Sequence, residues 1–218
     1  MNNELKIFNV TNRADLLLDE LHCQPAGVGK EDFPKNYLKC KSGDNIFDKD
    51  PYYSEFVFHY WFWKNQLKNY SENCWIGFCQ YRRYWLKENY DQNLIISREN
   101  LKDNMLSSVS PSWSNYDSVV AKRIYVHNPK FMKLVKKGFR NFLKDPTILF
   151  DKKKQTIKLH FDMFHGYGNL DKAINLIDKE DKDDFLKYVN NSVSYNPHIM
   201  FIAKPEILDK WFNVLFPY

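Results

Sequence analysis

The chain has 218 residues, 44% hydrophobic and 27% charged, a composition typical of a globular protein with one large core. Its formal charge is +5, and the lysines are dispersed, with short clusters at Lys136-Lys137 and Lys152-Lys153-Lys154, a distribution that argues against a nucleic-acid-binding protein. Because Cys23, Cys40, Cys74 and Cys79 form no CxxC pair, and the sequence has neither a signal peptide nor a membrane-length apolar run, we expect a reduced, cytosolic protein without a zinc site.

The first predicted element is a buried strand over Leu5–Val10 (LKIFNV), a short apolar run that Thr11 and Asn12 follow. Residues 24–50 are rich in Pro, Gly, Asp and Lys, and this composition predicts a long loop. Long loops inside compact domains are usually functional, so this segment is a candidate ligand-binding region.

An aromatic helix is predicted over Asp50–Asn65, with Asp50 as the N-cap and Pro51 at the first helical position. Aromatic residues fall on every face of this helix, so we expect it to be buried nearly all round. Glu55 would lie in its first turn.

The rest of the chain alternates between apolar runs and segments with helical spacing. The remaining predicted elements are strands over Cys74–Phe78 and Tyr116–Lys122, a helix over Pro129–Asp145, helices over Phe161–Lys179 and Lys182–Val189, a strand over His198–Lys204 and a helix over Pro205–Phe216. Strands that alternate with helices indicate an α/β fold with a mostly parallel sheet flanked by helices. Without a repeat or linker, we expect one domain over residues 1–218.

The strand over Cys74–Phe78 runs into a polar loop that begins with two arginines. The residues at this point are Gln80, Tyr81, Arg82 and Arg83. Ligands of open parallel sheets bind at the carboxyl ends of the strands, and each charged hydrogen bond from an arginine to a phosphate contributes about 1.5–3 kcal/mol. This pattern predicts a diphosphate site. The alternative is that one of the arginines neutralises a buried carboxylate such as that of Glu55.

Two stretches carry a family resemblance: GDNIFDKDPYYSEFVFHYWFWKN (residues 43–65) and WIGFCQYRRYW (residues 75–85). Together they resemble the paired signature of DUF4422, a domain of unknown function in bacterial glycosyltransferases of capsular and exopolysaccharide biosynthesis. Its pattern has GDNIS, an aromatic helix with Tyr-Trp-x-Trp-Lys-Asn, and a strand that ends in His-Tyr-Arg-Arg-Tyr. Weaker similarities in the same order occur in LKIFNVTNR, QPAGVG, YDSVVAKR, FHGYGNLDKA and NPHIMFIAKPEILDKWFNVLF.

The chain departs from this pattern at several positions. Gln80 replaces the usual His before Tyr-Arg-Arg, Ser54-Glu55-Phe56 replaces Cys-Glu-Leu, and Pro197-His198 intrudes near the Asn-Met-Phe motif. Either position 80 contacts the ligand without taking up a proton, or this member has a changed activity.

The resemblance implies a Rossmann-like, GT-A-type glycosyltransferase. Its donor would be a nucleotide-diphosphate sugar, and a UDP-sugar is the first candidate. Its acceptor would be a glycan or lipid-linked glycan of a capsule, exopolysaccharide or O-antigen. Such enzymes often hold a metal with Asp-x-Asp, but none follows Cys74–Phe78. We therefore expect no cofactor and propose that the arginines neutralise the leaving diphosphate. If manganese or magnesium is required, Asp44 and Asp91 are the candidate ligands.

Glycosyl transfer with inversion also needs a general base, for which Glu55, Asp162 and His165 are the candidates. Glu55 lies in the aromatic helix, where burial would raise its pKa, but it is equally a structural partner for an arginine. Asp162 and His165 are three residues apart, on one face if the helix has begun there. His165 matches a family motif residue, although a structural role is the alternative.

Further donor-binding candidates are Asp44 and Asn45, in the loop before the aromatic helix, and Asn196. Asp44 and Asn45 would bind ribose or sugar hydroxyls, or form an Asx turn; Asn196 would contact the acceptor or donor, or begin a strand. Trp61 and Trp63 could stack on a base or a sugar, but two residues apart on a helix they face different ways, so at least one belongs to the core.

Two other classes of function remain open at this stage. The first is a non-catalytic carbohydrate-binding or accessory protein of polysaccharide assembly, and the second is a nucleic-acid binder, whose affinity would depend steeply on salt. An enzyme that builds lipid-linked glycans would work in the cytoplasm and could associate peripherally with the inner face of the membrane.

Overall fold

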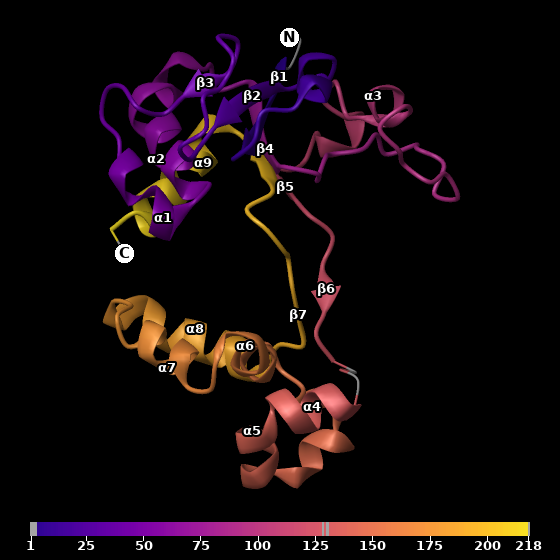
Figure 1. The fold of residues 1–218 in the computed structure, drawn as a ribbon, viewed down its shortest axis with the longest axis vertical. Coiled ribbons are helices and arrows are strands. Elements are labelled where there is room, and N and C mark those ends of the chain that lie inside the picture. The colour runs from indigo at the N-terminus through magenta and orange to yellow at the C-terminus, as the bar shows by residue number, and fades with distance from the viewer. Residues whose placement is uncertain (1–3, 128, 130, 218) are drawn as a thin grey trace. The chain divides into compact units, whose positions relative to one another are not determined.

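A six-stranded sheet with the strand order β3-β2-β1-β4-β8-β5 organises the first part of the fold (Figure 1). The strands are β1 (Glu4–Thr11), β2 (Gln24–Gly27), β3 (Leu38–Lys39), β4 (Cys74–Gln80), β5 (Ser118–Val120) and β8 (Phe201–Ala203). Strand β8 is antiparallel to both of its neighbours, whereas β3, β2, β1 and β4 pair in parallel. The predicted mixed α/β fold with a mostly parallel sheet is therefore confirmed.

The computed structural model describes residues 4–127, 129 and 131–217, and these fall into two compact units. The sheet unit comprises the chain up to Val120 together with His198–Pro217. The helical insert is the intervening segment Ala121–Pro197. That residues 1–218 act as one glycosyltransferase-like domain stays a prediction.

The central strand β4 is buried along its whole length. This agrees with its continuous apolar sequence, which is typical of a strand covered on both faces of the sheet. Its Gly77 lets β8 approach closely, because a Cβ at this position would lie 2.9 Å from Cγ1 of Ile202. Strand β1 is buried from Ile7 to Thr11 and pairs with β4 in register, Val10 opposite Gln80. The first and last predicted strands are thus confirmed.

The helices of the sheet unit are α1 (Asp50–Tyr53), α2 (Phe56–Asn65), α3 (Leu101–Asn104) and α9 (Pro205–Leu215). Phe58 and Phe62 of α2, Phe78 of β4 and Phe212 of α9 are fully buried in one core. The imidazole of His59 lies in this core, with its ring centre 4.5 Å from that of Phe78.

The prediction of one continuous helix over Asp50–Asn65 is wrong. Ser54 has φ 48° and ψ −124°, which ends α1 and lets α2 begin at Phe56, so Glu55 occupies the N-cap position of α2. Lys49, rather than Asp50, is the N-cap residue of α1, although Pro51 does lie in its first turn. Residues 24–50 also differ from the predicted loop, since they contain β2 and β3.

The helical insert begins and ends with β6 (Ile124–Tyr125) and β7 (Ser194–Tyr195), which pair antiparallel and so bring its two ends together. Its helices are α4 (Phe131–Lys137), α5 (Phe139–Lys144), α6 (Ile157–His165), α7 (Asn169–Ile174) and α8 (Lys179–Asn191). Two small apolar clusters hold it, one around Leu134 and Met163 and the other around Ile174 and Val189.

Glycines divide two helices that the sequence pattern predicts as continuous. Gly138 separates α4 from α5, and Gly166 and Gly168, with φ of 95° and 77°, separate α6 from α7. Such left-handed conformations favour glycine and end a right-handed helix. Short 3-10 helices lie at Leu16–Asp19, Phe47–Lys49, Leu67–Asn69, Pro111–Trp113, Pro146–Leu149 and Lys152–Lys154. In the described part of the chain, no helix is long and apolar enough to cross a membrane.

Candidate functional site

The carboxyl ends of β1 and β4 form the switch point of the sheet, because the chain leaves β1 toward β2 on one side and β4 lies on the other (Figure 1). The two ends are tied together by the hydrogen bond from the Tyr81 amide to the Val10 carbonyl, at 3.1 Å. In open α/β sheets this crevice is where ligands bind. The predicted position of the Tyr-Arg-Arg motif beyond a central strand is confirmed.

A tight turn presents the two arginines. The Arg83 amide donates to the Gln80 carbonyl at 2.9 Å, and Arg82 between them has φ 66°. The Arg82 guanidinium lies over the ring of Tyr81, 4.9 Å from its centre. Just beyond the turn the Trp85 indole donates to the Phe78 carbonyl at 2.9 Å, which fastens the loop back onto β4.

Both guanidinium groups are available to a ligand. Arg82 and Arg83 are exposed, and within the described residues neither forms an ion pair with a carboxylate. Neither therefore forms the close ion pair of the alternative, although the charge of Arg83 acts on the Glu55 carboxyl. Two exposed, unpaired cations on a rigid turn can bind an anionic group from solvent.

The carboxylate of Glu55 interacts with this turn through Gln80 and Arg83. The Gln80 side chain, which is buried, donates to Glu55 Oε2 at 3.5 Å. Burial raises the pKa of the Glu55 carboxyl, and the positive charge of Arg83 partly opposes the rise. A carboxylate with a raised pKa, held by an amide, has the properties of a general base.

Strained backbone conformations occur next to Glu55 and within the arginine turn. Within the described chain, the non-glycine residues with positive φ are Ser54, Arg82 and His198. Ser54 precedes Glu55, Arg82 precedes Arg83, and the charge of Arg83 acts on His198, whose pKa is lowered first by partial burial and then by that charge. Conformations of this kind cost about 1–3 kcal/mol each and are concentrated at functional sites.

A buried asparagine lies directly beneath the turn. Asn9 of β1 donates through Nδ2 to the Gln80 carbonyl and to Cys79 Sγ, both at 3.3 Å, while its Oδ1 has no partner. The side chain thus fixes the end of β4 from the neighbouring strand. Asn9 and His198 are not among the predicted site residues; their signals are a polar residue inside the apolar run LKIFNV and a Pro-His pair before a strand.

The loop candidates Asp44 and Asn45 make local structural contacts. Asn45 Oδ1 accepts from the Phe47 amide at 3.1 Å, and its Nδ2 donates to the Gly43 carbonyl at 2.8 Å, which is an Asx turn. Asp44 Oδ1 accepts from the Tyr60 hydroxyl at 3.1 Å. Binding of the donor by Asp44 and Asn45 stays a prediction. The alternative to it, an Asx turn, is present at Asn45.

The two tryptophans of α2 are held by the fold. Trp61 is buried and its indole donates to the Ser42 carbonyl at 2.7 Å. Trp63 is half-buried, donates to Asp209 Oδ1 at 2.7 Å and stacks on Phe216. The expectation that at least one of them belongs to the core is confirmed.

The remaining candidates lie in the helical insert. Asp162 is buried and accepts from Asn141 Nδ2 at 2.9 Å and from the Gly168 amide at 3.0 Å, so it stabilises the turn after α6. His165 ends α6 with an exposed ring packed on Phe161, 4.5 Å between centres. The Asn196 side chain donates to the Ala121 carbonyl at 2.6 Å. Thus the structure brings Glu55, Gln80, Tyr81, Arg82 and Arg83 together in the sheet unit.

Comparison with known proteins agrees with this arrangement. The family model for DUF4422, a domain of unknown function, matches residues 6–218. The chain belongs to the DUF4422 family. No curated protein matches it.

Among solved structures, this DUF4422 chain is similar to WbbM, described as a bifunctional glycosyltransferase and determined in its apo form. The TM-score is 0.58 at 20% sequence identity, and the match covers 99% of this chain. It spans 36% of the WbbM chain, about a third of that protein. At this identity the similarity establishes the shared fold.

Proposed function

We propose that this DUF4422 protein is a glycosyltransferase of the GT-A type. It would transfer a sugar from a nucleotide-diphosphate donor, in the first instance a UDP-sugar, to a growing capsular, exopolysaccharide or O-antigen glycan. The observation that carries the proposal is the turn after β4, where two exposed and unpaired arginines lie at the switch point of the sheet beside Glu55. The fold shared with WbbM supports it.

In this proposal Arg82 and Arg83 bind the diphosphate of the donor. As the bond between the sugar's anomeric carbon and the phosphate oxygen breaks, its electron pair stays on the diphosphate, and the guanidinium groups stabilise the added charge. Their backbone turn is fixed by the Gln80 carbonyl and the Trp85 indole, so little reorganisation is needed.

Glu55 is the proposed general base. The acceptor hydroxyl oxygen forms the new bond to the anomeric carbon, and its proton passes to the Glu55 carboxylate. Gln80, which cannot take up a proton, holds that carboxylate by its amide. This assigns position 80 a positioning role and explains how Gln can stand where the family pattern has His. Asp162 and His165 remain alternative bases.

We propose that the transfer needs no resident divalent cation. Within the described chain, no group of three His, Cys, Asp or Glu side chains could hold a metal. Asp44 is engaged by Tyr60, and Asp91 accepts from the Asn93 amide at 2.9 Å. We therefore assign charge neutralisation to the arginines. Activity that disappears with a chelator and returns with manganese would contradict this.

The carbohydrate-binding alternative has less support. Sugar-stacking aromatics must be exposed, but the aromatic helix α2 places Phe58, Trp61 and Phe62 in the core. A module that binds sugar alone would also have no use for a pair of free arginines at a sheet switch point.

A thermal-shift panel of UDP, GDP and CDP, each with manganese and with chelator, tests the proposal. We expect one nucleotide to raise the melting temperature without metal, and Arg82→Ala/Arg83→Ala to abolish the shift. Lys68→Ala/Lys102→Ala is the matched control, since it removes two exposed positive charges of the sheet unit away from the turn. The proposal fails if no nucleotide binds, or if the control loses binding equally.

A further inference from the structure

Positive charge is concentrated in one segment of the helical insert. Residues 131–158 contain nine Lys or Arg residues and two Asp residues, a formal charge of +7, whereas the whole chain carries +5. The rest of the chain is therefore net negative. The segment contains both short lysine clusters of the sequence, Lys136-Lys137 and Lys152-Lys153-Lys154, and its helices α4 and α5 and the two 3-10 helices that follow are packed together in one unit.

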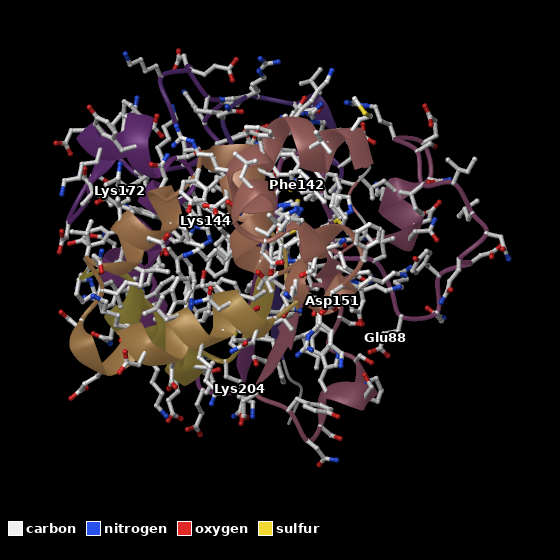
Figure 2. All side chains as sticks on the ribbon, turned by 90° about the horizontal axis from the view of Figure 1, so that it is seen from below. Glu88, Phe142, Lys144, Asp151, Lys172 and Lys204 are labelled. Atoms are coloured by element: carbon white, nitrogen blue, oxygen red, sulfur yellow. The ribbon has the colours of Figure 1, made fainter. Side chains whose placement is uncertain are left out.

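Most of these cations are free of carboxylate partners. Lys154 pairs with Asp145, and Lys158 pairs with Asp171. The other seven basic residues of the segment form no ion pair within the described chain. Lys144, which is labelled in Figure 2, lies instead over the ring of Tyr167, with its Nζ 5.1 Å from the ring centre.

Three of the basic side chains, Lys136, Lys137 and Arg140, line a cavity of about 420 Å³ between α4, α5 and the end of α6. The carboxylate of Asp162 also lines it, where it accepts hydrogen bonds from Asn141 and the Gly168 amide. A cavity with three cations on its rim suits a phosphate group, since charged hydrogen bonds to phosphate are the strong ones.

Large apolar side chains are exposed in the same segment. Phe150 is 87% exposed, Leu143 62%, Met132 58% and Phe139 51%. Phe139 and Leu143 lie four residues apart on α5 and therefore share a face, next to the face that Arg140 and Lys144 share. Apolar residues flanked by lysines are typical of helices that lie in the interface of a bilayer.

We propose that the surface formed by α4, α5 and residues 145–154 docks on an anionic phospholipid bilayer. The exposed apolar side chains enter the boundary between headgroups and acyl chains, and the cavity takes a lipid phosphate. The apolar residues favour this occupant over a nucleic acid, because binding to a phosphodiester backbone gains nothing from exposed Phe and Leu. The inference does not depend on the proposed glycosyl transfer.

Co-sedimentation of the full chain with vesicles tests the proposal. Equimolar phosphatidylcholine and phosphatidylglycerol should bind the protein, and pure phosphatidylcholine should not. Lys136→Glu/Lys137→Glu should weaken binding by roughly 30-fold or more, since each cation near an anionic bilayer contributes about fivefold. Leu143→Ser/Phe150→Ser should weaken it by about tenfold or more through loss of apolar burial.

The matched control is Lys172→Glu/Lys187→Glu, the same charge change at exposed lysines of α7 and α8 (Lys172 is labelled in Figure 2). It should keep nearly full binding. If Lys136→Glu/Lys137→Glu does not fold, as judged by circular dichroism, Lys152→Glu/Lys153→Glu replaces it. Equal binding to both kinds of vesicle, or an equal loss in the control, would overturn the proposal. So would binding to RNA that exceeds vesicle binding and survives Leu143→Ser/Phe150→Ser.

Discussion

Arg82 combines a strained backbone with an exposed charge, and two substitutions separate these properties. Arg82→Ala removes the guanidinium and keeps a Cβ in the left-handed conformation, at φ 66°. Arg82→Gly removes both. The two variants should therefore bind a nucleoside diphosphate equally poorly but differ in stability.

The size of the stability difference follows from two opposing terms. A left-handed conformation costs a residue with a Cβ about 1–2 kcal/mol, whereas glycine adopts it freely. Glycine in turn loses about 0.5–1 kcal/mol more conformational entropy on folding. Arg82→Gly should thus be about 0.5–1 kcal/mol more stable than Arg82→Ala, a melting temperature about 1–4 °C higher in a chain of this size.

Position 83 supplies the control, since Arg83 is not among the residues with positive φ. There glycine should be the less stable replacement, by about 0.5–1 kcal/mol. Urea denaturation measures all four variants, and UDP titration should show about 10- to 150-fold weaker binding for each, the loss of one charged hydrogen bond. If the Gly and Ala variants have the same order of stability at both positions, the backbone strain at Arg82 is refuted. If the UDP affinity is unchanged, the two arginines do not bind the diphosphate.

Three further predictions concern single side chains. Glu55→Gln should abolish turnover and keep the UDP thermal shift. The wild-type rate should fall as the pH drops through the raised pKa of Glu55, because a general base must be deprotonated. If the variant still turns over and its rate falls at low pH as in the wild type, Glu55 is not the base. Burial lowers the pKa of His59 to about 4 from 6.5, so the unfolded state takes up the proton at a higher pH than the folded state. The free energy of unfolding should therefore fall by up to roughly 3 kcal/mol as the pH falls from 6.5 toward 4. Urea denaturation of His59→Phe over that pH range should lack this dependence. Asn45→Ala should cost about 1 kcal/mol through loss of the Asx turn and leave the UDP shift intact, whereas a lost shift would make Asn45 a donor ligand.

Part of the candidate site was readable in the sequence because it is contiguous. Gln80–Arg83 comes at the end of an apolar run that predicts a buried strand, so local pattern and the general behaviour of parallel sheets together predict where the arginines lie. Asn9 and His198 come from segments about 70 residues or more away from this turn, and only strand pairing brings them to it.

The sequence alone determined the strands and helices whose apolar pattern is long and regular, namely β1, β4 and α9, and with them the α/β fold. The tertiary structure decided the rest, for a physical reason in each case. Strands of two or four residues such as β2 and β3 are stable only through pairing with a neighbour, so composition made them look like a loop. The helix break at Ser54 depends on a positive-φ backbone conformation that the residue pattern does not indicate. The free arginines needed the fold as well, since a sequence shows a charge but not whether another residue has already neutralised it.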